Sequence, residues 1–398
     1  MIHTVIIGGG IAGLTIAEEL AKHGENPVLL ERYPNFGGRI ATYREDNLQY
    51  EIGAGRINTK HARVKQLVER FKLNTFPIKT DSFFEHGPNP FHNLFKPIRS
   101  ILSTAENLNE TTIGDIVPEE LQPILTMYPY WAEMNLMRAD VALPLFNPDQ
   151  DMGKNAEYYG VKEGLDTITS KLAEAATAAG ADLRPRHRVH DIKRVEKNLF
   201  EITGDYGKKA DAKPFRIQAR RVIIATCRCS LTNFSVLKNL PLLDQLQTSA
   251  LIRIYAVYPK NADGTVWFQD VPKTVTNSKL RHVIPINPAS GLIMISYTDG
   301  KDTDHWRALE GKELQAAIQH EIKQLFPEKT ISEPTFLKKH DWPSGCTYWV
   351  PGDYEVEKAS KTAHNPSDNL YVCGESVSTE QAWIEGALQS AEYLLSIL

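Results

Sequence analysis

Three glycines near the start of the sequence have the spacing of a nucleotide-binding turn. Gly8, Gly10 and Gly13 directly follow a short apolar run, and Glu31 stands 18 residues beyond Gly13. In such a turn the first glycine allows the tight bend, the second lets the backbone approach a pyrophosphate, and the third lets a helix pack closely on a strand. An acid at the position of Glu31 accepts hydrogen bonds from ribose hydroxyls. These residues predict a dinucleotide site.

The same spacing has a second explanation, because glycine-rich turns also arise merely to join strands to helices. Here a strand, a turn, a helix, a second strand and a terminal acid follow one another in the order that a dinucleotide site requires, which favours the functional interpretation. Glu31 is acidic, and a basic residue would be expected opposite a ribose phosphate. The motif therefore leaves both NAD and FAD open.

Two further glycine clusters follow, and each of them ends in an arginine. The first contains Gly37, Gly38 and Arg39, and the second contains Gly55 and Arg56. Glycine lets the backbone come close to a ligand, and a guanidinium pairs with phosphate or carboxylate. We expect these clusters to extend the cofactor contact, and the alternative is two loops with surface arginines.

These residues require particular elements to position them. Apolar spacing predicts a strand over Val5–Ile7, a helix over Ile11–Ala21 and a second strand over Val28–Leu30. The strand and helix alternation resumes at Tyr158, after a helix over Ala62–Leu73. It continues with predicted strands at Val189–Ile192, Leu199–Thr203, Phe215–Gln218 and Val222–Ala225. A strand, a turn and a long helix close the sequence. The pattern predicts an α/β unit.

The intervening segments have a different character. From Thr80 to Asp151 prolines and aromatic residues replace the alternation, namely Phe83, Phe84, Phe91, Phe95, Tyr128, Tyr130 and Trp131. Four segments between Gln247 and Tyr297 predict an antiparallel sheet, namely LIRIYAVYP, TVWFQD, RHVIPIN and GLIMISYT, and a helix is predicted over Gly311–Leu325. We expect a nucleotide-binding domain of residues 1–79, 155–240 and 340–398, and an inserted substrate domain of residues 80–154 and 241–339.

Composition limits the classes of function. The chain has 398 residues, enough for two or three domains, and its formal net charge of −4 gives no support for a nucleic-acid partner. Its four cysteines show no metal-ligand spacing and are expected to be reduced thiols in a cytoplasmic protein. No apolar run approaches the ~20 residues that cross a bilayer, and we expect no leader segment, because the first strand begins almost at once.

Several motifs together resemble the FAD-dependent amine oxidase family, which includes monoamine, polyamine and L-amino acid oxidases. The matching segments are VIIGGGIAGL with LLE, GGRI, YEIGAGRI, RHRVHDI, VIIAT and NLYVCGESVSTEQAWIEGALQSA. The last is the most specific, because the family ends with an L-Y-x-x-G-E segment and an aromatic-x-E-G-A helix. The resemblance implies an FAD-binding Rossmann-like domain of the glutathione-reductase type with an inserted substrate domain.

The resemblance also assigns cofactor contacts. It implies that Gly8, Gly10, Ile11, Ala12, Gly13, Glu31 and Arg32 hold the ADP half of FAD, that Gly38 and Arg39 reach the pyrophosphate, and that the backbone of Val189 meets the adenine. Gly374 and Glu375 would contact the ribityl or phosphate region. Gly55, Arg56, Trp383 and Ile384 would lie near the flavin ring, where a helix N-terminus stabilises the reduced anion.

The substrate side rests on fewer residues. Trp383 falls where the family places one wall of an aromatic cage, and Tyr348 or Trp349 is expected to supply the opposing wall; either ring could instead be core. Arg56 occupies the position at which L-amino acid oxidases bind the substrate carboxylate, although it could equally contact the cofactor.

Two positions depart from the family. Arg253 stands where many members place a lysine beside the flavin, unless it is a surface or ion-paired strand residue. Arginine stays charged and cannot act as a base, which puts any lysine-dependent step in doubt. Cys346 lies in a context similar to that of a covalent flavin attachment, but the spacing to Pro351 is shorter, so we expect a free thiol and non-covalent FAD.

The implied reaction is oxidation of a carbon–nitrogen bond in a small amine or amino acid. Hydride passes to flavin N5, the imine hydrolyses, and molecular oxygen regenerates the flavin with release of hydrogen peroxide. One alternative is an oxidase or desaturase of a hydrophobic non-amine substrate, of the protoporphyrinogen oxidase or carotenoid desaturase type. Another is a non-catalytic FAD-binding protein. No metal site is expected, and the protein is expected to be a monomer or homodimer.

Overall fold

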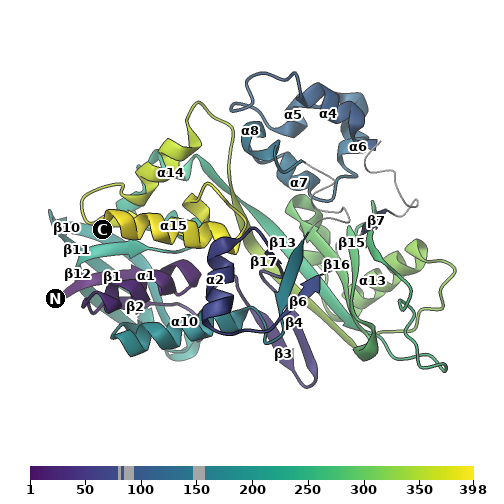
Figure 1. Ribbon diagram of the computed structural model, residues 1–398, viewed down its shortest axis with the longest axis horizontal. Coiled ribbons are helices and arrows are strands. Elements are labelled where there is room, and N and C mark those ends of the chain that lie inside the picture. The colour runs from purple at the N-terminus through teal and green to yellow at the C-terminus, as the bar shows by residue number, and fades with distance from the viewer. Residues whose placement is uncertain (79–81, 85–93, 147–156) are drawn as a thin grey trace.

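A computed structural model describes residues 1–78, 82–84, 94–146 and 157–398. Two sheets form its framework (Figure 1): a seven-stranded sheet near both marked termini and a six-stranded sheet on the opposite side, with a group of short helices above the latter. Phe91 lies outside the described residues, and so do both residues at each of the predicted domain boundaries 79/80 and 154/155.

The seven-stranded sheet has a parallel centre with an antiparallel extension. Its strands are β10 (His187–Glu196), β11 (Leu199–Tyr206), β12 (Lys213–Ile224), β1 (Ile2–Ile7), β2 (Val28–Leu30) and β9 (Asp182–Arg184), with β18 (Leu370–Val372) also paired to β12. Strands β18, β12, β1, β2 and β9 are mutually parallel along this path. Val5 to Ile7 are almost fully buried, as expected for a parallel sheet that is covered on both faces.

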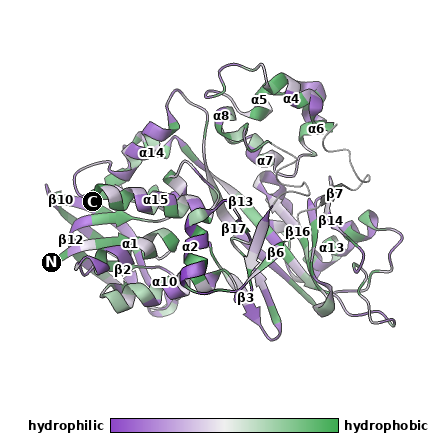
Figure 2. Cartoon of the chain, in the orientation of Figure 1, coloured by the Kyte–Doolittle hydropathy of each residue, from purple (hydrophilic) through white to green (hydrophobic). Residues whose placement is uncertain are grey.

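Helices cover both faces of this sheet. Ile6 points to the face covered by α1 (Ile11–Lys22), α10 (Asp166–Ala179), α15 (Ile384–Ile397) and α2 (Ala62–Arg70). Val5 and Ile7 point to the other face, where α14 (Val356–His364) and α11 (Arg228–Leu231) contribute to the apolar cluster. Polar and apolar residues alternate along α2 and α10 in Figure 2, the pattern of helices with one buried side. The pairing of α1 with α15 joins segments from opposite ends of the sequence.

The six-stranded sheet is organised on two long strands, β13 (Leu246–Val257) and β17 (Phe336–Trp349), which pair antiparallel. The order continues through β16 (Leu292–Asp299), β15 (His282–Asn287), β14 (Lys273–Val275) and β7 (Ser82–Phe84). Helices α12 (Thr303–Arg307) and α13 (Gly311–Leu325) contribute to the apolar cluster on one of its faces.

The strand predicted over TVWFQD is wrong. Val266, Trp267 and Phe268 lie in consecutive turns, with Gln269 N donating to Val266 O at 3.0 Å and Val271 N to Phe268 O at 3.1 Å. All three apolar side chains are buried in the cluster beside α13. The apolar composition of this segment therefore reflects burial in a compact loop rather than sheet pairing.

Smaller elements connect the two sheets. The helical group contains α4 (Lys96–Leu102), α5 (Ile113–Ile116), α6 (Gln122–Leu125), α7 (Trp131–Met134) and α8 (Ala139–Ala142). Its apolar cluster includes Tyr348 of β17, which ties the group to the six-stranded sheet.

A hairpin is formed by β3 (Thr42–Glu45) and β4 (Leu48–Glu51), and a small sheet by β5 (Ile57–Asn58), β8 (Tyr158–Val161) and β6 (Thr75–Ile78).

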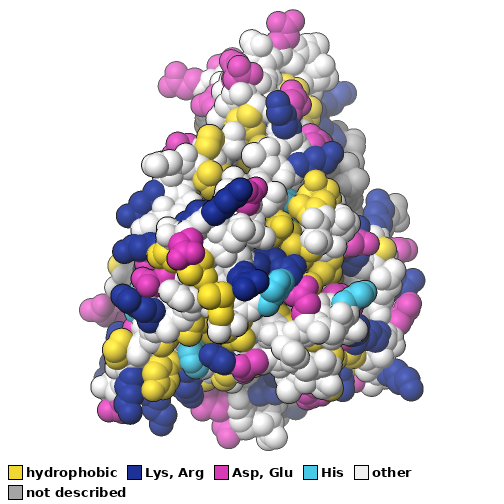
Figure 3. All heavy atoms as spheres, turned by 90° about the vertical axis from the view of Figure 1, so that its left-hand side faces the viewer, with side chains coloured by type: hydrophobic (Ala, Val, Ile, Leu, Met, Phe, Trp, Pro, Cys, Tyr) yellow, Lys and Arg dark blue, Asp and Glu magenta, His cyan; other side chains and the backbone are white. Residues whose placement is uncertain are grey.

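The surface is of mixed charge. Basic and acidic side chains are interspersed on the face drawn in Figure 3, consistent with the small net charge. Among the described residues, every helix is too short or too polar to cross a membrane. In the same part of the chain, His, Cys, Asp and Glu side chains form no group of three that could hold a metal ion.

Candidate active site

In the turn between β1 and α1, a side chain would collide with the protein at two of the three glycines and would meet open space at the third. Gly8 has a φ of +111°, and a Cβ there would lie 2.5 Å from Ala225 O. A Cβ on Gly13 would lie 2.0 Å from Gly8 O, whereas a Cβ on Gly10 would meet no atom within 4 Å. Gly8 and Gly13 are thus required by packing of the protein itself. The space above Gly10 and the first residues of α1, Ile11 and Ala12, suits a ligand phosphate at a helix N-terminus.

Glu31 lies directly beside this turn. Its carboxylate accepts hydrogen bonds from Gly9 N at 2.7 Å and Tyr33 N at 2.8 Å, and its side chain is almost completely buried. Burial raises the pKa of Glu31, while the two backbone N–H groups oppose that shift. A carboxylate oxygen has more than one acceptor position, so Glu31 can hold the turn and still receive ribose hydroxyls.

The adenine end of the predicted site is marked by the start of β10. His187 N donates to Glu31 O at 2.7 Å, which places the strand containing Val189 close to Glu31. Arg32 follows Glu31, and its guanidinium lies 4.6 Å from the ring centre of Tyr33. The structure therefore brings these predicted residues to the same edge of the parallel sheet as the glycine turn.

Arg39 and Glu375 form an ion pair of 2.7 Å that joins three segments. Arg39 also donates to Gly345 O at 3.0 Å. Burial alone would lower the pKa of Arg39, but the charge of Glu375, the hydrogen bond to Glu375 and smaller contributions from nearby thiols together raise it. Glu375 in turn accepts from Thr347 N at 2.8 Å and Ala382 N at 3.0 Å.

The Arg39 and Glu375 pair lies close to the glycine turn. Gly37 forms a bridge with Gly10, and a Cβ on Gly38 would lie 3.5 Å from Gly10 Cα. A Cβ on Gly374 would lie 3.9 Å from the Cβ of Ala12. Residues 8–13, 37–39 and 374–375 thus meet in one place, where the sequence predicts the pyrophosphate.

A group of rings surrounds Arg56. Its guanidinium carbon lies 4.3 Å from the ring centre of Tyr158 and 5.6 Å from that of Trp383, and Nη2 donates to the hydroxyl of Tyr130 at 3.3 Å. The Tyr158 and Trp383 rings are nearly parallel, at 11°, with centres 6.1 Å apart. His61 meets Trp383 edge-on at 4.9 Å. Burial lowers the pKa of His61, which favours the neutral ring at physiological pH.

Trp383 is the N-cap of α15, so Ile384 begins a helix of 14 residues whose N-terminus points to this group. The preceding residue, Ala382, has a φ of +66°, an uncommon backbone conformation for alanine. The hydrogen bond from Ala382 N to Glu375 holds this conformation. The same carboxylate therefore positions both the Arg39 contact and the aromatic group.

Arg253 lies at the edge of the Gly55–Arg56 segment. It donates through Nη1 to Glu51 O at 3.2 Å, and its guanidinium lies 5.2 Å from the ring centre of Tyr297. A Cβ on Gly55 would come within 3.1 Å of Arg253 Nη1. Arg253 thus contacts the predicted cofactor segment as well as the six-stranded sheet, on which it lies between β16 and β17.

The second wall predicted at Tyr348 or Trp349 stays a prediction, and both side chains are buried. Tyr348 is buried and donates from its hydroxyl to Glu133 Oε1 at 2.6 Å, and burial raises its pKa well above the usual value. Trp349 is fully buried in the core, where its Nε1 donates to Ser378 O at 2.9 Å. In the part of the chain that the structure describes, the rings recorded against Trp383 are those of Tyr158 and His61.

Sequence reasoning missed Tyr158 and His61 as partners of Trp383. Neither lies in a motif, and both are brought to α15 by the pairing of β5 with β8 and the packing of α2 on α15.

Cys346 is a partly buried thiol. Burial, followed by the charges of Glu375 and Glu133, raises the pKa of Cys346 to about 12, so the thiol is protonated at neutral pH.

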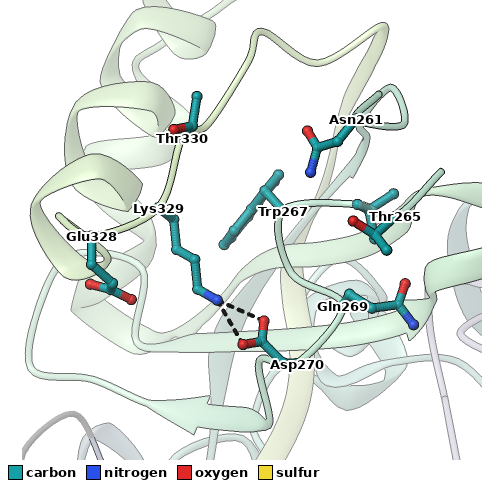
Figure 4. Close-up of a pocket in the computed structure, with 9 residues that line it drawn as sticks. Asn261, Thr265, Trp267, Gln269, Asp270, Glu328, Lys329 and Thr330 are labelled. Atoms are coloured by element: carbon teal, nitrogen blue, oxygen red, sulfur yellow. Dashed lines mark hydrogen bonds and ion pairs between the residues drawn. The ribbon is translucent and has the colours of Figure 1, made fainter. Parts of the chain in front are cut away.

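A recess of about 550 Å³ lies elsewhere, between the turns at 261–270 and the segment after α13 (Figure 4). Lys329 crosses it and donates to Asp270 at 2.7 and 2.8 Å, beside the buried Trp267. It includes none of the predicted site residues.

A family model described as flavin containing amine oxidoreductase matches residues 115–393, and one described as an NAD(P)-binding Rossmann-like domain matches residues 6–71. This chain belongs to the flavin-containing amine oxidoreductase family. It is an FAD-dependent oxidoreductase, and the open space over Gly10, the position of Glu31 and the meeting of residues 8–13 with 374–375 fit FAD.

Individual relatives agree with membership of the amine oxidoreductase family. An L-amino acid oxidase from Crotalus durissus cumanensis is 23% identical over 450 residues, which cover 98% of this chain and 88% of the relative. The structure of cyclohexylamine oxidase from Brevibacterium oxydans IH-35A has a TM-score of 0.75 at 16% identity, over 100% of this chain and 98% of that one. A candidate protoporphyrinogen oxidase from Exiguobacterium sp. 255-15 has a TM-score of 0.72, also at 16% identity, with coverages of 100% and 98%.

Proposed function

We propose that this protein oxidises the carbon–nitrogen bond of a small amine that carries a carboxylate, as an L-amino acid does. FAD, when bound, would supply the redox chemistry, taking up a hydride from the α-carbon and returning the electrons to oxygen, with hydrogen peroxide as the product. The substrate becomes an imine, which water hydrolyses to a carbonyl compound. The protein supplies orientation, exclusion of water and fixed charge.

The arrangement of Arg56 is the observation that carries this proposal. Its guanidinium is stacked on Tyr158 and hydrogen-bonded to Tyr130, close to Trp383 at the N-terminus of α15. The contact with the Tyr158 ring and the hydrogen bond to Tyr130 restrain the guanidinium, whose N–H groups can bind a carboxylate through two parallel hydrogen bonds. The similarity to L-amino acid oxidases supports the same substrate class.

The rings around Arg56 have a second role. The rings of Tyr158, Trp383 and the neutral His61 exclude water from a bound amine and favour its nitrogen whether it is cationic or neutral. Arg253 is held by Glu51 O and Tyr297 beside Gly55, where it supplies a permanent positive charge. Such a charge stabilises a developing anion but cannot accept a proton.

Peroxide release tests the proposal with matched substrate pairs, each an L-amino acid and the amine formed by its decarboxylation. We expect the wild-type protein to prefer the amino acid. Arg56→Ala should lower kcat/KM for the amino acid by on the order of 100-fold and change the amine far less, because it removes one partner of a charge pair. Arg216→Ala is the control, since Arg216 is an exposed cation of β12, with its side chain 71% exposed.

Other outcomes separate the competing functions. If Arg56→Ala lowered kcat/KM equally for the amino acid and its matched amine, Arg56 would be assigned to cofactor binding and not to binding of the substrate carboxylate. Oxidation of a porphyrinogen alone would favour the hydrophobic-substrate alternative. FAD-loaded protein that releases no peroxide with any substrate would favour a non-catalytic role.

We also propose that FAD is held without a covalent bond. The protonated state of Cys346 supports this, because thiol addition requires the thiolate. Precipitation of the yellow protein with acid should leave the flavin in the supernatant, and flavin in the pellet that is lost in Cys346→Ala would contradict it.

A further inference from the structure

The N-terminus of α2, which lies beside α15 in Figure 1, receives its hydrogen-bond acceptor from that helix. The N-cap residue, His61, makes no side-chain cap hydrogen bond, and the first turn of α2 contains no acidic residue. The backbone N–H groups of Arg63 and Val64 instead donate to the carboxylate of Glu385, in the first turn of α15, at 3.0 to 3.1 Å. The first N–H groups of a helix have no partner within that helix, so Glu385 replaces the local cap.

Two carboxylates of α15 contact the same arginine in different surroundings. Glu385 forms an ion pair of 3.2 Å with the guanidinium of Arg63, and its own side chain is only 4% exposed. Glu392 contacts that guanidinium at 2.5 Å from the surface, with its side chain 67% exposed. Hydrogen bonds to a buried, charged acceptor are stronger than those at the surface. Glu385 is therefore the carboxylate that docks α2 on α15.

The chain just before α2 carries the groups that surround Trp383. His61 N donates to Asn58 O at 2.9 Å, and Asn58 N donates to His61 Nδ1 at 3.3 Å, so no free linker separates β5 from α2. Asn58 in turn pairs with Tyr158 of β8, and Arg56 directly precedes β5. A displacement of the N-terminus of α2 would therefore be passed to all of these residues together.

The start of α15 is held independently of α2. A Cβ on Gly386 would lie 1.7 Å from Glu380 O, so the first turn of α15 is packed closely against the segment before it. Trp383, the N-cap of this helix, lies two residues before Glu385. The contact between Glu385 and the backbone of α2 thus joins a fixed helix start to the segment that carries the other groups of the site.

We propose that Glu385 is a positioning residue of the candidate active site, which acts through the N-terminus of α2 to set His61 and Arg56 against Trp383. His61 meets the Trp383 ring edge-on at 4.9 Å, and the Arg56 guanidinium carbon lies 5.6 Å from the centre of that ring. The effect on catalysis rests on the proposed function, in which Arg56 binds the substrate carboxylate. The docking of α2 by Glu385 does not rest on it.

The expected effect is on the orientation of the substrate. Displacement of the Arg56 segment leaves each binding group present but changes its spacing from Trp383. A misplacement of about 1 Å can lower a rate by about 100-fold. Loss of the Glu385 carboxylate should therefore lower kcat more than it raises KM.

Peroxide release by FAD-loaded Glu385→Gln, with the L-amino acid that the wild type prefers, tests this role. We expect kcat/KM to fall at least about tenfold, mainly through kcat, because the amide nitrogen of glutamine cannot accept from backbone N–H groups. Glu392→Gln is the matched control, since it removes an acid of the same helix that contacts the same guanidinium. It should stay within about twofold of wild type.

A double-mutant cycle with Trp383→Ala separates positioning from a general effect on the fold. If Glu385 acts by placing groups against Trp383, Glu385→Gln should cost less than about threefold once the indole is absent. An equal fold-loss in both backgrounds would overturn the proposal. So would an unchanged kcat/KM for Glu385→Gln alone.

Amide hydrogen exchange of the FAD-loaded wild type needs neither a variant that folds nor turnover. The amides of Arg63 and Val64 should be strongly protected although they begin a helix. The corresponding amides of α14, Glu357 and Lys358, are the control and should exchange faster, because the N-cap of α14 makes no side-chain hydrogen bond. Equally fast exchange at the two helix starts would overturn the docking and, with it, the proposal.

The same measurement distinguishes failure of the positioning role from failure of the proposed function. Protected amides, with no peroxide from any substrate, would reject the proposed function and the catalytic role of Glu385 while leaving its docking of α2 established. Peroxide release that is insensitive to Glu385→Gln would reject the positioning role alone.

Discussion

Glu51 shows how a single carboxyl group links the site to pH. Burial raises its pKa to about 7, against hydrogen bonds from Leu165 N and the Thr42 hydroxyl, with Asp166 raising it further and Arg253 lowering it. The backbone oxygen of Glu51 accepts from Arg253 and Tyr255. The side chain that titrates near neutral pH thus belongs to the same residue whose backbone carbonyl holds Arg253.

The free energy of unfolding should therefore depend on Glu51 near neutral pH. Its pKa is higher in the folded state than in the unfolded state, so its protonated form stabilises the fold at low pH, and this contribution is lost as pH rises through about 7. A shift from 4.5 to about 7 corresponds to about 3 kcal/mol at most. Urea unfolding at pH 5 and pH 8 should show a larger decrease for wild type than for Glu51→Gln. Equal decreases in the free energy of unfolding of the two proteins would contradict a raised pKa at Glu51.

Some side-chain positions could be predicted from the sequence, and others depend on contacts across the whole chain. Glu31 was expected beside the glycine turn and lies there, because a strand of fixed length carries it to that edge. Its hydrogen bonds to Gly9 N and Tyr33 N could not be foreseen. Tyr158 reaches Trp383 only through sheet pairing between distant segments, for which local spacing gives no signal.

The turn between β1 and α1 separates the requirements of folding from those of ligand binding. Gly10 has a φ of −75°, which alanine adopts readily, and its missing Cβ faces open space. Gly13 faces the Gly8 carbonyl at 2.0 Å from a Cβ position. A side chain at Gly10 should thus affect ligand binding, whereas a side chain at Gly13 should affect the stability of the fold.

We expect Gly10→Ala to fold with stability equal to or up to about 1 kcal/mol above wild type, while FAD affinity falls at least about tenfold, since the methyl group occupies the predicted phosphate position. Gly13→Ala should lose about 1–3 kcal/mol of stability, because α1 must move away from Gly8. Thermal unfolding of the FAD-free proteins and fluorescence titration with FAD measure the two effects. Equal loss of stability in both variants would reject this division.

Hydrophobic spacing predicted most of the regular elements but not every partner. Val5–Ile7 and Val28–Leu30 fall within or coincide with β1 and β2, because consecutive buried residues in a parallel strand leave a clear pattern. The TVWFQD segment is also rich in β-branched and aromatic residues but lies in turns without strand pairing. On β17, Tyr348 and Trp349 point into different clusters, and only the register with β13 decides which side each one faces.

The molecule as a unit depends on contacts between segments far apart in the sequence. Helix α1 packs on α15, β18 pairs with β12, and Gly374 lies against Ala12. A ligand seated on the glycine turn would therefore stabilise residues 8–13 and 374–386 together.

Removal of FAD should reveal this coupling. FAD at about 100 times its Kd adds about 2.7 kcal/mol to the free energy of unfolding and raises Tm by a few degrees. Hydrogen exchange should quicken in residues 8–13 and 374–386 after FAD is removed, while α13 (Gly311–Leu325), outside the candidate site, serves as the control segment. Faster exchange at only one of the two segments would show that they do not respond as one site.

The pairing of β18 with β12 and of α15 with α1 also constrains the order of events during synthesis. A ribosome releases residues 1–31 long before residues 370–397, so the glycine turn emerges while its C-terminal partners do not yet exist. Until then β12 lacks its neighbour β18, and the part of α1 that packs on α15 is not yet covered. A chain interrupted before residue 370 would lack Gly374 and Glu375, so we expect it to be unable to complete the candidate FAD site.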